Sequence, residues 1–374
     1  MARLLLAALF AAAFPAAPGA QVFEAGDVAL RAETLADGLE HPWGIAFLPD
    51  GSAVVTERAG RLRLFSQGRL SPPLDGVPRV ATIGQGGLLD VAPAGDFETS
   101  RTLFLSFSEP GPGGAGTAIA RARLVREGDA ARLADVETIF SMNRRTGAGR
   151  HFGSRIVPAP DGTLFFTIGD RGEMERAQDV SDHAGSVLRI NPDGSVPSDN
   201  PFLDTPGAAP EIWSIGHRNP QGAVFDPVTG ALWTVEHGPR GGDEVNRPEP
   251  GRNYGWPRVS YGRHYSGRGI EMGAEAPGFE PPKHYWDPSI APSGMTVYDG
   301  DMFPEWRGDF LVAALAFQLL ARLERDDAGE IVGEERLLEG AFGRLRDVEV
   351  APDGSVWLLT DEADGRIIRL SRAP

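Results

Sequence analysis

A repeated unit of two apolar segments joined by a short turn runs through most of this 374-residue chain. In its clearest copies an alternating apolar segment ends in Pro-Asp-Gly and a second apolar segment follows, with the turns at 49–51, 160–162 and 352–354. Asp-Gly between alternating apolar segments predicts a β-hairpin, because glycine tolerates the positive φ that a tight turn requires. The unit that most constrains the fold is therefore a pair of antiparallel strands.

Six copies of this unit begin near residues 45, 89, 156, 223, 295 and 347. Their unequal spacing indicates one structural unit with connecting loops of very different lengths. Repeated strand units are typical of propellers, in which each blade buries its faces against its neighbours. We predict an all-β fold, a six-bladed β-propeller whose long loops form a site at one mouth of the central channel. Two β-sandwiches in tandem would show the same alternation, although no linker-like stretch divides the chain.

Two further patterns concern the edges of the blades. Several copies are followed by Gly, an apolar residue, Arg and another apolar residue, as at 60–64, 185–190 and 365–370, which predicts an outer strand. The segment at 28–31, Val-Ala-Leu-Arg, is expected to add a strand to the last blade and so close the ring. Closure would remove the exposed sheet edges that invite aggregation.

The first twenty residues have the composition of a secretory signal. Arg3 precedes an apolar run from residue 4 to 14, and small residues at 16–20 follow it. The run is too short to span a bilayer, so we predict a cleaved signal at 1–20, a propeller over 21–374, no membrane span after signal removal and a periplasmic or secreted protein. The chain has no cysteine, so export brings no disulfides and thiol chemistry is excluded.

The charge balance limits the partners of the protein. The chain has 52 acidic and 36 basic residues, a formal net charge of −16. Nucleic acid is not expected as a partner, because its phosphate backbone requires a basic surface. An acidic protein is compatible with an environment rich in calcium.

Polar residues flanked by glycines recur beside the predicted inner strands. Placed at equivalent ends of repeated strands, they would all face the channel on one rim, where a rigid propeller displays its functional loops. These segments lie at 84–87, 149–153, 169–172, 216–222 and 236–244, with Arg344 and Arg346 before the last repeat.

The segment around His151 suggests acid–base chemistry. His151 lies between glycines that free the backbone to place it, and Asp170 follows one hairpin later. An aspartate can orient an imidazole and raise its basicity, which makes a general base near neutral pH. A lone histidine can equally be a structural residue.

Other rim residues are suited to an anionic, electron-accepting ligand. Arg218 and Asn219 provide a charge and amide donors for a planar carbonyl, although Asn-Pro is also a common turn starter. Arg344 and Arg346 alternate on a predicted strand, so both side chains are expected to point the same way and bind carboxylates. A solvated basic surface is the alternative interpretation of that pair.

A calcium site is suggested less strongly. Gly238 and Pro239 offer consecutive backbone carbonyls in an irregular segment, with Glu244 and Tyr254 nearby. Calcium prefers oxygen ligands of these kinds. The chain has no linear Asp-rich calcium loop, and the number of ions is not specified by the pattern.

Taken together, these motifs resemble the soluble quinoprotein glucose/sorbosone dehydrogenases, most closely their aldose sugar dehydrogenase branch. The resemblance runs in order from about residue 38 to the end of the chain. It implies a six-bladed propeller that binds pyrroloquinoline quinone and calcium. It also implies oxidation of the anomeric hydroxyl of an aldose sugar to a lactone, with electrons leaving to a separate acceptor.

The resemblance assigns roles residue by residue. His151 resembles the proton acceptor, and Arg218 would stabilise charge on the quinone. Gln85 and Asp170 match positions that face substrate and cofactor, Gly238 and Pro239 match carbonyls on the cofactor's calcium, and Glu244 and Tyr254 match a further calcium site. The expected cofactor contacts are Gln85, Arg218, Asn219, Tyr261, Arg344 and Arg346.

One position departs from the family pattern. Glucose-specific members carry a lysine that contacts the quinone where Ala316 stands here. Loss of that cation is expected to weaken or retune cofactor binding, and it puts glucose as the substrate in doubt.

Two other functions fit a propeller of this kind. A calcium-dependent lactonase would hold calcium by carboxylates and amides at the channel centre and would need no paired arginines. A propeller without catalysis would only bind glycans or a protein partner, which the loss of the lysine favours and the presence of His151, Asp170, Arg218 and Arg344 opposes.

Overall fold

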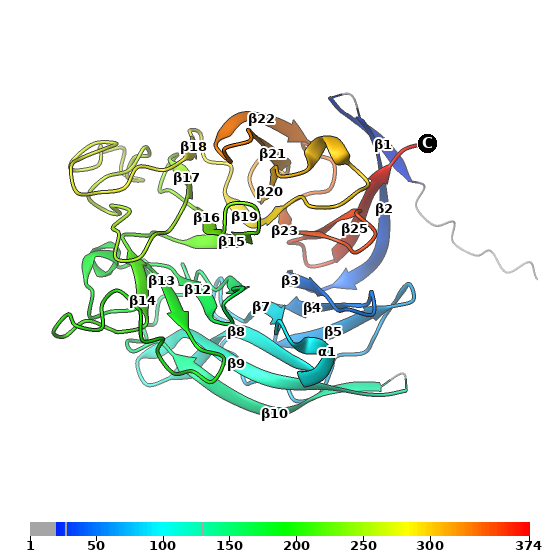
Figure 1. Ribbon diagram of the computed structural model, residues 1–374, viewed down its shortest axis with the longest axis horizontal. Helices are drawn as coiled ribbons and strands as arrows, with labels where there is room; N and C mark the ends of the chain where they lie inside the picture. The colour runs from blue at the N-terminus through cyan, green and yellow to red at the C-terminus, as the bar shows by residue number, and fades with distance from the viewer. Residues whose placement is uncertain (1–19, 27, 129) are drawn as a thin grey trace, which may run out of the picture.

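The strands of the computed structural model form six antiparallel sheets arranged as a ring (Figure 1). The structure describes residues 20–374 apart from 27 and 129. The prediction of a six-bladed β-propeller is confirmed. The predicted signal lies outside the described residues except for Ala20.

Each blade is one sheet whose strands follow the chain outward from the channel. The first three blades are β3 (Pro42–Phe47), β4 (Ala53–Glu57), β5 (Arg61–Ser66) and β6 (Arg69–Leu70); β7 (Leu88–Pro93), β8 (Thr102–Gly111), β9 (Gly114–Glu127) and β10 (Ala130–Ser141); and β11 (Ile156–Pro158), β12 (Leu164–Ile168), β13 (Ser186–Ile190) and β14 (Ile212–Ile215). The next two are β15 (Pro220–Asp226), β16 (Ala231–Glu236), β17 (Asp243–Asn246) and β18 (His284–Trp286); and β19 (Pro292–Val297), β20 (Phe310–Ala314), β21 (Leu320–Arg325) and β22 (Ile331–Leu337). Short helical turns are α1 (Phe97–Ser100), η1 (Met174–Gln178) and η2 (Pro304–Trp306).

The last blade closes the ring with both ends of the described chain. It contains β23 (Leu345–Val350), β24 (Val356–Thr360) and β25 (Gly365–Arg372), to which β2 (Val28–Leu39) and β1 (Gln21–Ala25) are added. β2 runs antiparallel to β25, pairing Leu30 with Arg372 and Leu39 with Gly365. The predicted closure by the segment at 28–31 is confirmed. The Gly-apolar-Arg pattern lies in β5, β13 and β25, which are the third strands of their blades and not the outermost ones.

The Pro-Asp-Gly turns form hairpins for a local reason. In the turn between β3 and β4, Asp50 accepts hydrogen bonds from the backbone N–H and the hydroxyl of Ser52, and Gly51 has a φ of 79°. The same bonds join Asp161 to Thr163 and Asp353 to Ser355. Each turn therefore holds its own backbone and sets the register of its hairpin.

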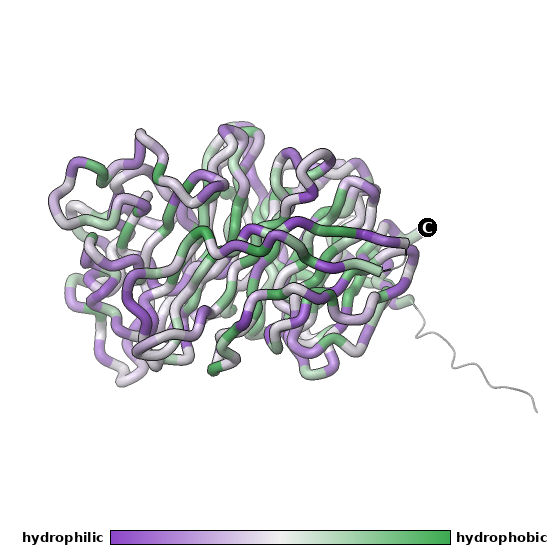
Figure 2. Tube along the Cα trace, turned by 90° about the horizontal axis from the view of Figure 1, so that it is seen from below, coloured by the Kyte–Doolittle hydropathy of each residue, from purple (hydrophilic) through white to green (hydrophobic). Residues whose placement is uncertain are grey.

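The hydrophobic core lies between neighbouring blades. One large cluster joins the fifth and last blades through Trp306, Phe303 and Leu358, all buried completely. Phe303 and Trp306 are stacked with ring centroids 4.4 Å apart. Hydrophilic segments are most frequent in the outer loops of the trace (Figure 2). Burying each such aromatic side chain stabilises the fold by about 1.5–3 kcal/mol, so the ring is held by blade-to-blade packing.

A buried ion-pair cluster lies among the inner strands. Arg155, just before β11, contacts Asp90 of β7 at 3.0 Å and Asp347 of β23 at 2.9 Å. Backbone N–H groups complete both carboxylates, Ile156 donating to Asp90 at 2.7 Å and Ile45 to Asp347 at 3.0 Å. We call Asp90, Arg155 and Asp347 the inner cluster. It joins three blades through one guanidinium.

No helix among the described residues is long and apolar enough to cross a membrane.

Candidate active site

A histidine–aspartate pair lies where the second and third blades meet. His151, in the loop between β10 and β11, places its Nδ1 2.6 Å from Oδ1 of Asp170, which follows β12. His151 has a left-handed backbone (φ 55°), and its N–H donates to Oε1 of Gln85 at 2.7 Å. Gly84 (φ 56°) permits this contact, because a Cβ there would lie 2.1 Å from the carbonyl oxygen of Gly149.

Asp170 is held as an acceptor by three donors. Besides His151, the indole Nε1 of Trp256 donates to it at 2.8 Å and the N–H of Gly172 at 2.6 Å. Burial alone would raise the pKa of Asp170, but the hydrogen bond from His151 and the charges of His151 and Arg218 outweigh it and lower that pKa. An ionised carboxylate only accepts, so Nδ1 of His151 carries the proton and Nε2 keeps its lone pair.

The imidazole of His151 is poised as a base. Burial lowers its pKa below 6.5, the bond to Asp170 opposes this shift, and the charge of Arg218 adds to it. The ring is therefore neutral at pH 7 and can accept a proton at Nε2.

Arg218 and Asn219 lie beside this pair, in the segment that leads into β15. The guanidinium of Arg218 donates to the carbonyl of His237 at 3.1 Å and lies 5.4 Å from the ring of Trp256. Asn219 is completely buried, and its Oδ1 accepts from the N–H of Gly153 at 3.2 Å. Its Nδ2 has no partner among the described residues. A buried amide donor without an acceptor is costly, which fits a position that faces a ligand.

The two arginines before and in β23 differ in exposure. Arg346 is buried and donates to Oε1 of Gln221 at 2.9 Å and to Asp361. Arg344 is exposed and reaches only the carbonyl of Leu315, at 3.4 Å. The register of β23 shifts between Leu345 and Asp347, so the simple alternation expected for this pair is interrupted there.

His237 connects the arginine side with the base side. Burial and then the charges of Arg218, Arg346 and His151 hold its pKa well below 6.5. Its Nε2 is buried without a hydrogen-bond partner in the described part of the chain. Arg218, Arg346 and His151 thus share one mouth of the channel.

The predicted calcium residues gather around a small cavity next to Arg218. Gly238, Glu244 and Tyr254 line it together with Trp256. Pro239 follows Gly238 outside that lining. A Cβ on Gly238 would lie 2.2 Å from the carbonyl oxygen of Gly242, so the backbone is closely folded here.

Carboxylates concentrate on this side of the mouth. Asn246 donates to Glu236 at 3.0 Å and to Glu244 at 3.2 Å, which brings the two acids together. Burial and then the charge of Glu236 hold the pKa of Glu244 well above its usual value. The hydroxyl of Tyr254 already bonds Arg247 and Glu249, so a metal contact from Tyr254 would use its backbone carbonyl.

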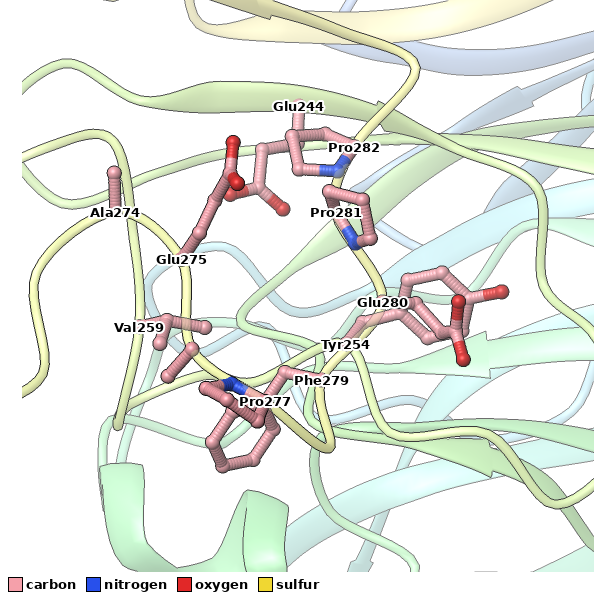
Figure 3. A pocket seen from close by; sticks show the side chains of 11 residues that line it. Glu244, Tyr254, Val259, Ala274, Glu275, Pro277, Phe279, Glu280, Pro281 and Pro282 are labelled. Atoms are coloured by element: carbon pink, nitrogen blue, oxygen red, sulfur yellow. The ribbon is translucent and has the colours of Figure 1, made fainter.

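A larger pocket of about 330 Å³ adjoins this cavity (Figure 3). Glu244 of β17 and Glu275 of the long loop between β17 and β18 both line it. Tyr261 donates to Glu275 and stacks on Tyr285 at 4.0 Å. Burial and the bond to Glu275 raise the pKa of Tyr261 to about 12. Tyr261 therefore lies beside the carboxylates, and its hydroxyl is occupied.

The family model described as glucose/sorbosone dehydrogenase matches residues 39–369. The chain belongs to this family. An aldose sugar dehydrogenase of Escherichia coli, YliI, is 43% identical over 353 residues, which cover 93% of this chain and 94% of that protein. A crystal structure of the soluble E. coli aldose sugar dehydrogenase in its apo form gives a TM-score of 0.88 at 42% identity and covers 92% of this chain and 100% of that one. A PQQ-bound aldose sugar dehydrogenase from Streptomyces coelicolor gives 0.77 at 29% identity, covering 96% of this chain and 100% of that one.

The family resemblance predicted from the sequence is thus confirmed. The glucose/sorbosone dehydrogenase fold brings His151, Asp170, Gln85, Arg218 and Asn219 into contact or near contact. Sequence reasoning assigned no role to four residues of the same mouth: Arg58, Trp256, His237 and Asp361. Trp256 and His237 stood in glycine-flanked or aromatic loop segments that could have signalled them, whereas Arg58 and Asp361 are inconspicuous residues at the ends of strands.

Proposed function

We propose that this protein is a quinone-dependent aldose sugar dehydrogenase that oxidises the anomeric hydroxyl of a sugar to a lactone. The observation that carries the proposal is one mouth of the channel that unites an oriented neutral imidazole with Arg218 and Arg344, neither of which pairs with a carboxylate among the described residues. Family membership and the similarity to a PQQ-bound sugar dehydrogenase support the same function.

The residues at the mouth fit a flat anionic quinone. In the part of the chain that the structure describes, Asn219 has an amide donor with no partner, and Nε of Arg346 is also buried without one. Arg344 is free to bind a carboxylate, and arginine's planar fork matches that group. Pyrroloquinoline quinone would therefore be held by Arg218, Asn219, Arg344 and Arg346, with Gln85 and Tyr261 at the edge of the site.

The fit to calcium rests on oxygen atoms of two kinds. Gly238 and Pro239 would offer backbone carbonyls to the cofactor's ion, and Glu244 with the carbonyl of Tyr254 would hold a second ion. Burial and Glu236 oppose ionisation of Glu244, and a divalent cation bound there would favour the ionised carboxylate. Among the described residues no three His, Asp or Glu side chains are grouped as metal ligands.

Each residue of the site has one role in the proposed reaction. When bound, the quinone supplies a two-electron acceptor and calcium a Lewis acid. Oxidation of the anomeric C–OH to a lactone removes a hydride equivalent and a proton. Nε2 of His151 takes the proton, Asp170 keeps the imidazole in the right tautomer and stabilises its cation, and Arg218 provides positive charge where an anion develops.

The inner cluster counts against a lactonase. In that reading, acids at the channel centre would hold calcium. Here Asp90 and Asp347 instead both pair with the guanidinium of Arg155.

Export and electron transfer complete the proposal. The segment at 1–20 directs the protein to the periplasm or the medium, where millimolar calcium is available. Electrons then pass to a separate acceptor.

Dye reduction by the purified protein, reconstituted with quinone and calcium and tested on a panel of aldoses, decides between these functions. A dehydrogenase requires both cofactors for turnover. Acid release from a lactone without any electron acceptor would establish a hydrolase, and sugar binding without turnover would establish a non-catalytic propeller.

A further inference from the structure

Arg58 is a rim residue that the site described above does not use. It follows β4 at the turn into β5 and is half-buried. Its N–H donates to the carbonyl of His41 at 3.1 Å, and its own carbonyl accepts from Leu88 at 3.2 Å. These bonds fix the backbone of Arg58 between the first, second and last blades.

The side chain of Arg58 lies between the two halves of the mouth. On one side its Nη1 approaches the carbonyl of Gly84 at 3.4 Å, next to the Gln85 side chain that bonds His151. On the other side the charges of Arg346, Arg344 and Asp361 act on it. Its Nε is buried without a hydrogen-bond partner in the described part of the chain.

The three arginines outnumber the acids that neutralise them. Asp361 pairs with Arg346 and with Nδ1 of His41. Within residues 20–374, leaving aside 27 and 129, no ion pair joins Arg58 or Arg344 to a carboxylate. By contrast Arg61, three residues after Arg58, pairs with both Glu57 and Glu40.

The protonation balance of Arg58 agrees with this geometry. Burial lowers its pKa, and Arg346 and Arg344 lower it further against the opposing effect of Asp361. A guanidinium held among like charges is destabilising unless an anion joins it.

We infer that Arg58 is a third arginine that binds a carboxylate of the quinone, together with Arg344 and Arg346. The inference rests on the proposed function. Pyrroloquinoline quinone carries three carboxylates, and a cradle of three guanidiniums around it would lie between the base at His151 and the last blade.

Quinone titration of an Arg58→Gln variant, followed by absorption in the presence of calcium and without sugar, tests the inference. We expect Kd to rise at least about tenfold, because one charge-assisted contact is lost. Arg69→Gln is the matched control, since it removes one exposed charge from the outer edge of the same blade, and its Kd should stay within about twofold. Equal affinity of the Arg58→Gln variant and the wild type would overturn the inference.

Thermal unfolding without ligand separates binding from a structural role. Arg58→Gln removes a charge whose burial is unfavourable, so this variant should melt at or above the wild-type temperature, and Arg58→Lys should recover part of the quinone affinity. A melting temperature several degrees lower, with no recovery in Arg58→Lys, would assign Arg58 a structural role and overturn the inference.

A redox-inert tricarboxylate distinguishes failure of the proposed function from failure of the inference about Arg58. If the wild type binds no quinone, the proposed function fails, and benzene-1,3,5-tricarboxylate then tests the arginines alone. Weaker binding of this probe by Arg58→Gln than by the wild type would still support an anion site. No binding of the probe to the wild type would end both proposals.

Discussion

Arginines occur in two different states near the channel of this propeller. Arg155 in the inner cluster lies between two carboxylates that are themselves completed by backbone donors. Within the described residues, the side chains of Arg58 and Arg344 at the mouth contact only carbonyl oxygens, at 3.4 Å each. Arg346 is intermediate: over the same part of the chain it has one acid, Asp361, and an Nε without a partner.

This difference separates charges that serve the fold from charges that await a ligand. A buried charge without a partner is expensive, so a fold tolerates it only where another molecule completes it. The close packing of glycines against the inner cluster agrees with a structural role for its charges. A Cβ on Gly44 would lie 2.6 Å from a carboxylate oxygen of Asp90, and one on Gly294 would lie 2.1 Å from a carboxylate oxygen of Asp347, so each glycine packs directly against its acid.

The largest effect on catalysis is expected from His151, the proposed general base. His151→Ala should lower kcat by about 10²–10⁴-fold, the usual contribution of a positioned general base. Quinone affinity should change little, because the arginines hold the cofactor. Steady-state dye reduction beside a binding titration measures both, and activity within tenfold of wild type would refute the role of His151.

Substitution within the inner cluster should lower the stability of the fold. Arg155→Met leaves Asp90 and Asp347 buried and unpaired, at a cost of about 3–5 kcal/mol in the free energy of unfolding. Denaturant unfolding of the ligand-free protein provides the value. A variant as stable as the wild type would show that the two kinds of arginine do not differ in the way described.

A smaller effect on kcat is expected from Asp170, the hydrogen-bond partner of His151. Asp170→Asn should reduce kcat by about tenfold to a hundredfold, the cost of losing a charge-assisted hydrogen bond. Because burial and Arg218 lower the pKa of His151 while Asp170 opposes them, wild-type activity should fall to half only below pH 6.5, and the variant's acid limb should move lower still. An acid limb of Asp170→Asn at higher pH than that of the wild type would contradict the proposal that Asp170 raises the pKa of His151.

The smallest effect on folding is expected at the exposed arginine. Arg344→Gln should change the free energy of unfolding by no more than about 0.5 kcal/mol, as usual for an unpaired surface residue, while weakening quinone binding. Unfolding and titration on the same preparation check the contrast with Arg155. A loss of stability comparable to that of Arg155→Met would place Arg344 in the structural class.

The architecture was predictable because its signals are local. Asp50, Asp161 and Asp353 each build a turn within three residues, so these three hairpins could be recognised without knowledge of their neighbours. The closing strand was predictable for a similar reason, since an unpaired apolar segment at 28–31 needed a partner. The Gly-apolar-Arg strands were placed too far out because nothing local reveals that a fourth strand follows.

The mouth was predictable only in part. Glycine-flanked loops indicated His151, Arg218 and Gly238, but contacts across blades depend on ring closure. The charge of Arg346 acts on Arg58 although 288 positions separate them in the sequence, and no periodicity links β4 to β23. Trp256 reaches Asp170 from a long loop whose path is set by packing, which a linear pattern does not encode.

The central claim is that unpaired positive charge at the mouth binds an anionic quinone. An absorption titration of the wild-type protein with pyrroloquinoline quinone, with calcium and with a chelator and at rising salt, tests it most directly. The account predicts saturable binding that requires calcium and weakens as salt increases. An unchanged spectrum with calcium present, or binding indifferent to salt, would contradict it.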